Sequence, residues 1–253
     1  MNYGKTVKAW SAGLIFSVAT SFASAGPIAT MTLDFQDDAA NGGFPEGSRT
    51  GQISGVDGRV RAGMFRFAVA EANFSDSAPF QLSTNDVLDA FCVDINTYLA
   101  YGPTQYSLVR ADDYFDDPDS TVVNRIGQLY SGYNKVINTP DNSAAFQLAL
   151  WEIINETGAD LSLSGNQQGS FAASEFGSAL GLANEWLEKL DDFDNDYNLF
   201  VLKSGSDGDH KLSQDLLVYS PAPVKVPEPG TLALLALGIC GLLLRKKSGR
   251  TKE

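Results

Sequence analysis

The sequence predicts an α+β protein in which an antiparallel sheet, folded as a β-sandwich or a barrel, contains an inserted helical region. Residues 26–226, called the body below, show strand-like alternation of apolar residues in their first and last parts and helical periodicity in the middle. That order is typical of α+β folds rather than of repeated βαβ units. The same prediction places a signal helix before the domain and a membrane helix after it. A hydrophobic content of 43% argues against wholesale disorder.

The first strands are expected at residues 31–35 and within 52–74. Asp57-Gly58 is a two-residue hairpin signal, and large apolar side chains alternate with other residues after it. A further strand is expected over 87–99. The final strands are expected at 197–203 and 212–219.

Three helices are expected between these strands, at 121–130, 142–155 and 172–190. Asn142 or Ser143 can cap the second helix, and Gly158 lies where it would stop. The third helix carries its apolar side chains in one stripe, which is typical of a helix packed on a core.

The first 25 residues have the order of a secretory signal peptide. Lys5 and Lys8 form a positive n-region, residues 9–22 are mostly apolar, and Ala23 and Ala25 provide the small residues of a cleavage site. We therefore expect signal peptidase to release the domain at residue 26 after export.

The C-terminal end combines a short motif, an apolar helix and a positive stop. Pro227-Glu228-Pro229 precedes an uncharged stretch at 231–244, and three basic residues follow at 245–247. The stretch is shorter than the roughly 20 residues that usually span a membrane, so a buried core helix is the alternative. The flanking motif and basic residues favour a membrane helix whose positive end lies in the cytoplasm.

This tail, at 226–250, resembles the PEP-CTERM sorting tail of Gram-negative bacteria. The resemblance implies an exported protein that the inner membrane holds, facing the periplasm, until an exosortase removes the tail. The protein would then reach the cell surface or the extracellular matrix, where this family is associated with exopolysaccharide and biofilm. The chain would divide into the signal peptide at 1–25, an exported domain at 26–219, a Pro-rich linker at 220–229 and the tail.

The body is strongly acidic. It holds 11 of the 18 basic residues and 29 of the 31 acidic ones, which gives a net charge of about −18 against −13 for the whole chain. Such a body should not bind nucleic acid, because phosphate contacts need clustered Lys and Arg. With one histidine in the chain, most zinc sites and a Ser-His-Asp triad are also disfavoured, and we expect no cofactor.

One weak metal signal remains. Asp192, Asp194 and Asp196 have the alternating acids that open an EF-hand loop. The loop lacks the glycine at its sixth position and the glutamate at its twelfth. A solvated helix end is therefore the alternative to a calcium site.

Two residues of the body are unusual for their surroundings. Gln147 lies within an apolar helical stripe, where an amide without partners would cost roughly 1–3 kcal/mol. Cys92 is the only cysteine of the body, so its thiol is free, intermolecular or chemically committed. On the expected strand it shares a face with Asp94, and Phe91 lies on the opposite face.

The segments Phe91-Cys92-Val93-Asp94 and Gln147-Leu148-Ala149-Leu150-Trp151 resemble the two motifs of bacterial Cys-Gln thioester domains. The resemblance implies that the Cys92 sulfur displaces ammonia from Gln147 and leaves an internal thioester, with Phe91, Asp94, Ala149 and Trp151 as supporting residues. A target amine or hydroxyl then attacks the Gln147 carbonyl and becomes covalently linked. One alternative is an unreacted pair, with Cys92 as a small core residue and Gln147 bonded to neighbouring backbone, and another is a catalytic cysteine.

These observations predict an exported surface or matrix protein that is not an enzyme. Its partners would be signal peptidase and exosortase during processing, the inner membrane transiently, and an extracellular polysaccharide or protein target. The first hypothesis is covalent attachment through the thioester, and the second is a noncovalent structural protein of the biofilm matrix. A hydrolase of extracellular polymer is the third, although the sequence nominates no acid/base pair for it.

Overall fold

The computed structural model describes residues 27–221, except for 39, 77, 117–118, 157–160, 165–170 and 208–209. The predicted signal helix and the predicted membrane helix lie outside the described residues. Within the described part of the chain, no helix is both long enough and apolar enough to cross a membrane.

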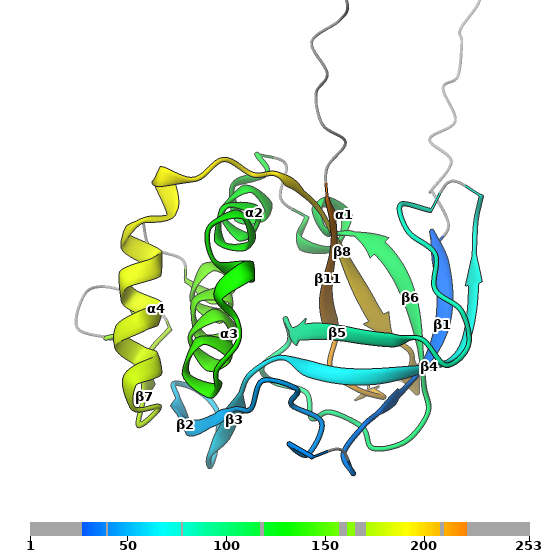
Figure 1. Cartoon of the computed structure of the whole chain (residues 1–253), viewed down its shortest axis with the longest axis horizontal. Coiled ribbons are helices and arrows are strands. Elements are labelled where there is room, and N and C mark those ends of the chain that lie inside the picture. The colour runs from blue at the N-terminus through cyan, green and yellow to red at the C-terminus, as the bar shows by residue number, and fades with distance from the viewer. Residues whose placement is uncertain are drawn as a thin grey trace, which may run out of the picture.

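The centre of the fold is a closed barrel whose antiparallel strands follow the order β1-β4-β5-β11-β8-β6 (Figure 1). Its strands are β1 (Ala29–Phe35), β4 (Phe65–Phe74), β5 (Val87–Cys92), β6 (Thr104–Arg110), β8 (Tyr197–Ser204) and β11 (Leu216–Pro221). Alternate side chains of β1, from Ala29 to Phe35, are buried in the core while their neighbours are half-exposed. The predicted antiparallel sheet is therefore confirmed, and it takes the barrel form.

Helices cover one side of this barrel. They are α1 (Ala111–Phe115), α2 (Thr121–Tyr133), α3 (Pro140–Asn155) and α4 (Ser178–Glu188), with the short 3-10 helices η1 (Asn134–Val136) and η2 (Leu190–Asp192). Figure 1 shows α2, α3 and α4 packed together beside the strands. Every side chain of α3 from 143 to 153 is buried, so α3 is the central helix of this layer.

Short strands complete the structure. A three-stranded sheet of order β3-β2-β7 contains β2 (Arg49–Ile53), β3 (Val60–Ala62) and β7 (Ala173–Ser174), and β9 (Ser206–Asp207) pairs with β10 (His210–Lys211). Antiparallel pairing of β2 with β3 confirms a hairpin around Asp57-Gly58. Its loop covers 54–59, so the expectation of a two-residue turn was wrong.

Other boundaries also differ from the sequence predictions. The strand expected over 87–99 ends at Cys92, because the Asp94 carboxylate accepts hydrogen bonds from Asn96 N–H and from Thr97 Oγ1–H and so forms a turn. The helix expected from 172 begins at Ser178, because residues 173–174 pair with β2. Strand β6 and helix α1 were not predicted.

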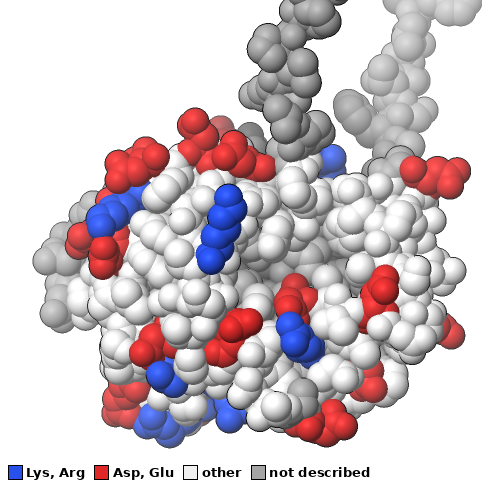
Figure 2. Space-filling view, in the orientation of Figure 1, with Lys and Arg blue, Asp and Glu red and all other residues white. Residues whose placement is uncertain are grey.

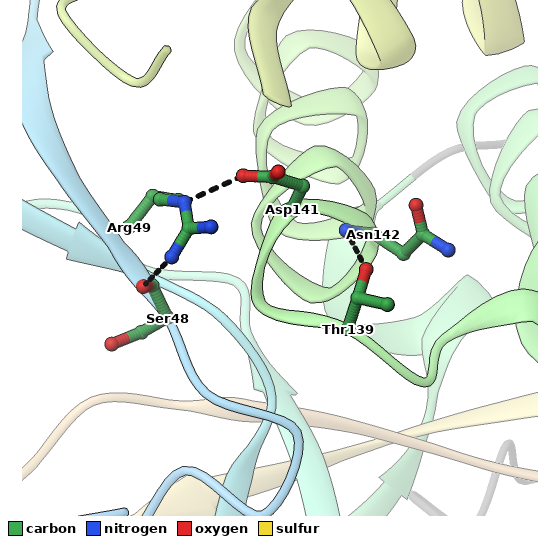
Figure 3. Close-up of polar contacts among 5 residues, drawn as sticks. All are labelled: Ser48, Arg49, Thr139, Asp141 and Asn142. Carbon is green, nitrogen blue, oxygen red and sulfur yellow. Dashed lines mark hydrogen bonds and ion pairs between the residues drawn. The ribbon is translucent and has the colours of Figure 1, made fainter. Parts of the chain in front are cut away.

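The residue that caps the start of α3 also differs from the prediction. Thr139, rather than Asn142 or Ser143, precedes the helix and accepts a hydrogen bond from Asn142 N–H at 3.1 Å (Figure 3). Pro140 follows as the first helical residue, which suits proline because that position needs no amide donor. Arg49 of β2 also pairs with Asp141, which ties the start of α3 to the small sheet.

Acidic side chains are widely distributed over the face in Figure 2, and most basic side chains there have acidic neighbours. Arg66 and Asp89, on adjacent strands β4 and β5, form a two-point ion pair with distances of 2.8 and 2.7 Å. Basic side chains gather at the lower left of this face, where acidic side chains lie beside them.

Candidate functional site

The Gln147 carboxamide is bonded to the backbone of Cys92 on both of its sides. Cys92 N–H donates to Gln147 Oε1 at 2.9 Å, and Gln147 Nε2 donates to the Cys92 carbonyl oxygen at 2.8 Å. The two residues are 55 positions apart, and neither has any solvent exposure. The structure thus brings together the two residues that the sequence singled out, and a barrel strand and the central helix hold them there.

A side chain can occupy this position because β4 and β5 separate just before Cys92. Their register pairs Phe65 with Ala90, and no pair of this register extends to Cys92. Gly63, with φ near +156°, lies at the separation, where an added Cβ would come within 2.9 Å of the Gly47 carbonyl oxygen. The Gln147 amide therefore forms the hydrogen bonds to the Cys92 N–H and carbonyl oxygen that a longer β4 would otherwise form.

One stripe of α3 supplies these contacts. Ser143, Gln147 and Trp151 are spaced four residues apart and so lie on one face of the helix. Ser143 Oγ accepts a hydrogen bond from Met64 N–H at 2.8 Å, one turn before Gln147 reaches Cys92. The cap at Thr139 and the Arg49–Asp141 pair fix the end of the helix from which this stripe begins.

The surroundings of the Cys92 sulfur favour the neutral thiol over the thiolate. Burial raises the pKa of the thiol well above its usual range, and the indole of Trp151 partly opposes the increase. Its Sγ donates to the Asp94 carbonyl oxygen at 3.1 Å. Trp151 Nε1 is buried and makes no well-formed hydrogen bond in the described part of the chain, although it lies close enough to the sulfur to lower the pKa of the thiol. One buried donor therefore remains available near the sulfur.

A polar network continues from the pair into the barrel. Asp215 is fully buried, accepts hydrogen bonds from Tyr114 Oη and Ser204 N at 2.8 Å each, and its carbonyl oxygen accepts from Val93 N–H at 3.0 Å. Burial, with an added contribution from Asp215, raises the pKa of Tyr106 to about 12. Strand β11 thus fixes the chain on the far side of Cys92 from Gln147.

The predicted supporting residues lie around the pair. Phe91 packs on Phe146 with 4.5 Å between ring centroids, Ala149 is fully buried, and Asp94 forms the turn after β5. The predicted calcium residues Asp192, Asp194 and Asp196 lie in η2 and the loop before β8. Among the described residues, no three acidic, histidine or cysteine side chains gather closely enough to hold a metal ion.

Sequence reasoning missed Glu152, which follows Trp151 on α3. Its side chain is fully buried, and Oε1 accepts a hydrogen bond from Ser162 N–H at 2.6 Å, whereas Oε2 has no partner within the described residues. Burial raises the pKa of this carboxyl to about 7. The sequence could have indicated Glu152, because its carboxylate lies next to the apolar stripe of the helix.

Comparisons with known proteins match the tail to a family and find a solved structure with limited similarity to the chain. Residues 225–247 match the family described as the PEP-CTERM protein-sorting motif. A solved structure, the N-terminal thioester domain of protein F2 like fibronectin-binding protein from Streptococcus pneumoniae, is similar with a TM-score of 0.38 and 13% identity, covering 74% of this chain and 98% of that chain. No curated protein sequence matches this chain significantly. The sorting motif indicates an exported protein that exosortase processes.

Proposed function

We propose that this exported protein forms an internal thioester between Cys92 and Gln147 and uses it to attach covalently to an amine or a hydroxyl of an extracellular target. The two hydrogen bonds that hold the Gln147 carboxamide against the Cys92 backbone carry the proposal. They fix the acyl group beside the residue that bears the only thiol in the described part of the chain. Such fixed proximity replaces a bimolecular encounter by an intramolecular reaction.

The reaction balances without any further reagent. The Cys92 sulfur attacks Gln147 Cδ, the Cδ–Nε2 bond breaks, and the thiol proton leaves with the nitrogen as ammonia. The Cys92 N–H, already 2.9 Å from Oε1, is placed to stabilise negative charge on that oxygen as the sulfur adds. The unpartnered indole N–H of Trp151 can stabilise the thiolate that must form first.

The second reaction transfers the acyl group. A target amine or hydroxyl attacks Gln147 Cδ, the new C–N or C–O bond forms, and the C–S bond breaks. The Cys92 thiol is regenerated with the proton that the nucleophile loses. Complete burial of both residues excludes bulk water from the bond and so favours its survival until a target reaches it.

Intact-mass spectrometry of the exported protein tests this proposal. We expect a mass about 17 Da below that of the processed sequence, which methylamine raises by roughly 31 Da while making Cys92 accessible to alkylation. Cys92→Ala provides the control, because it retains the backbone groups that bind Gln147 but has no sulfur. An untreated mass equal to the sequence mass, unchanged by methylamine, would refute the thioester.

A noncovalent structural role is the second candidate, and one observation favours it. Both the oxygen and the nitrogen of the Gln147 carboxamide already have backbone partners, so the pair can stabilise the fold without reacting. In that case the protein is a matrix component that the sorting tail delivers. The same mass experiment separates the two candidates, since only the thioester loses ammonia.

A further inference from the structure

A large groove opens at the end of the barrel where β1 ends and β4 begins. Its volume is about 1050 Å³, just above the roughly 300–1,000 Å³ that is usual for small-molecule sites. Phe35 and Phe65 lie at its base, and the loops that follow β1, β2 and β5 form its walls. This volume is large enough to hold a segment of an extended chain.

Two tyrosines on the wall after β5 are unusually exposed. Tyr98 is 85% exposed and Tyr101 is 75% exposed, although tyrosine usually buries most of its ring. Both line the groove, and the Tyr101 ring meets Phe35 edge to face with 5.8 Å between centroids. The groove therefore carries two largely exposed aromatic rings in its lining.

The segment that carries these tyrosines is anchored on both sides of Tyr98. On one side, the Asp94 carboxylate accepts a hydrogen bond from Thr97 Oγ1–H at 2.7 Å. On the other, Ala100 N–H donates to Ser213 Oγ at 3.0 Å, and Ser213 Oγ also accepts a hydrogen bond from the Tyr106 hydroxyl. Because these bonds order the segment before any ligand arrives, binding loses less conformational entropy.

Polar groups of both charges complete the lining. Asp37 and Asp57 line the groove together with Arg59 and Arg61, and the Arg61 guanidinium lies 4.9 Å from the centre of the Phe44 ring. Arg59 is ion-paired with Glu175, so the formal charges of these five residues nearly cancel, although the chain as a whole carries a net charge of −13. A neutral ligand rich in hydrogen-bonding groups fits such a lining better than an anion, which the acidic protein would repel.

We propose that this groove binds a neutral glycan chain. The apolar C–H faces of sugar rings would pack on Tyr98 and Tyr101, and their hydroxyls would bond to the carboxylate and guanidinium groups between the walls. A peptide would instead be held by anchor side chains in a buried apolar pocket, and the polar walls suit this mode less well. The proposal does not depend on the thioester, because none of these contacts uses Cys92 or Gln147.

Isothermal titration of the purified exported protein with maltohexaose, cellohexaose and mannohexaose tests the groove. An alginate hexamer serves as the anionic comparison and a tryptic peptide mixture as the peptide comparison. We expect at least one neutral hexasaccharide to bind. Tyr98→Ala or Tyr101→Ala should weaken that binding about tenfold, as the loss of one stacked ring predicts.

Three control variants define the result. Tyr98→Phe and Tyr101→Phe keep the rings and should bind within about threefold of the wild type, whereas Cys92→Ala should bind equally well. The proposal is overturned if no neutral hexasaccharide binds, if only alginate or peptide binds, or if neither alanine variant weakens the binding. Sugar binding by Cys92→Ala together with a full untreated wild-type mass would retain the glycan site and refute the thioester alone.

Discussion

Replacing Gln147 by methionine in a Cys92→Ala background tests whether the carboxamide holds the barrel and the helix together. The background removes the sulfur, so no cross-link contributes to stability, while the backbone groups at position 92 remain. Methionine is close to glutamine in shape but offers no amide. The substitution would leave one buried N–H and one buried carbonyl without the partners they have at 2.9 and 2.8 Å.

The magnitude follows from the two unmade bonds. Each buried backbone group left without a partner costs about 1–3 kcal/mol, and the gain from burying a more apolar side chain offsets about 1–2 kcal/mol of the sum. From the middle of these ranges we expect a net loss of about 2.5 kcal/mol in the free energy of unfolding, a large share of the roughly 5–15 kcal/mol typical of a domain. Urea unfolding at pH 7 measures it.

Leu150→Met in the same background is the matched control. Leu150 is also fully buried on α3, and the change keeps its volume and apolar character, so it should cost less than about 1.5 kcal/mol. If Gln147→Met costs no more than Leu150→Met, the carboxamide does not contribute to stability through the backbone of residue 92, and the geometric basis of the site is wrong.

Three further predictions concern α3. Glu152→Gln should remove a pH dependence: because burial raises the carboxyl pKa from 4.5 to about 7, the native state binds more protons between these values, and wild-type stability falls as pH rises through that window. Urea titrations should show the free energy of unfolding of the variant, relative to that of the wild type, rising by on the order of 2 kcal/mol from pH 4.5 to pH 8.5. A difference between the two proteins that does not change with pH would contradict this. Thr139→Ala should cost about 1 kcal/mol in thermal unfolding by removing the acceptor for Asn142 N–H, whereas Thr139→Ser should cost little. Trp151→Phe should slow the loss of ammonia in time-resolved mass spectra by removing the buried indole donor, and an unchanged rate would exclude that role.

The elements that the sequence predicted well are those in which local pattern and burial agree. Strand β1 and the first half of β4 alternate in sequence and also in burial, since each has one face in the barrel. Strand β5 was drawn too long because Val93 and Ile95 continue its alternation, whereas the turn depends on where the Asp94 side chain points. The prediction for helix α4 began too early, because residues 173–174 form a short strand that depends on pairing with the distant strand β2.

The sequence singled out both residues of the candidate site, and it offered a bond from Gln147 to neighbouring backbone only as an alternative to a thioester. An amide within an apolar stripe and a lone thiol are anomalies that a sequence displays by itself. That Gln147 would bond to the backbone of Cys92, rather than to other side chains, depends on the separation of β4 from β5 at Gly63. The groove could not be predicted, because its walls are loops that only the closed barrel brings together.

The registers of the barrel place the candidate sites away from the segment that leads to the sorting tail. Ala29 pairs with Leu108 at one end of the barrel, and Pro221, which precedes the sorting tail in sequence, pairs with Tyr197 at that same end (Figure 1). Cys92 pairs with Leu216 at the opposite end, where the groove also opens. Because Pro221 and the candidate sites lie at opposite ends of the barrel, we predict that a target can reach both sites while the tail still holds the domain at a membrane. An anchored variant with the exosortase motif disabled should consequently retain methylamine incorporation and glycan binding, and loss of both on anchoring would show that release, rather than folding, exposes the sites.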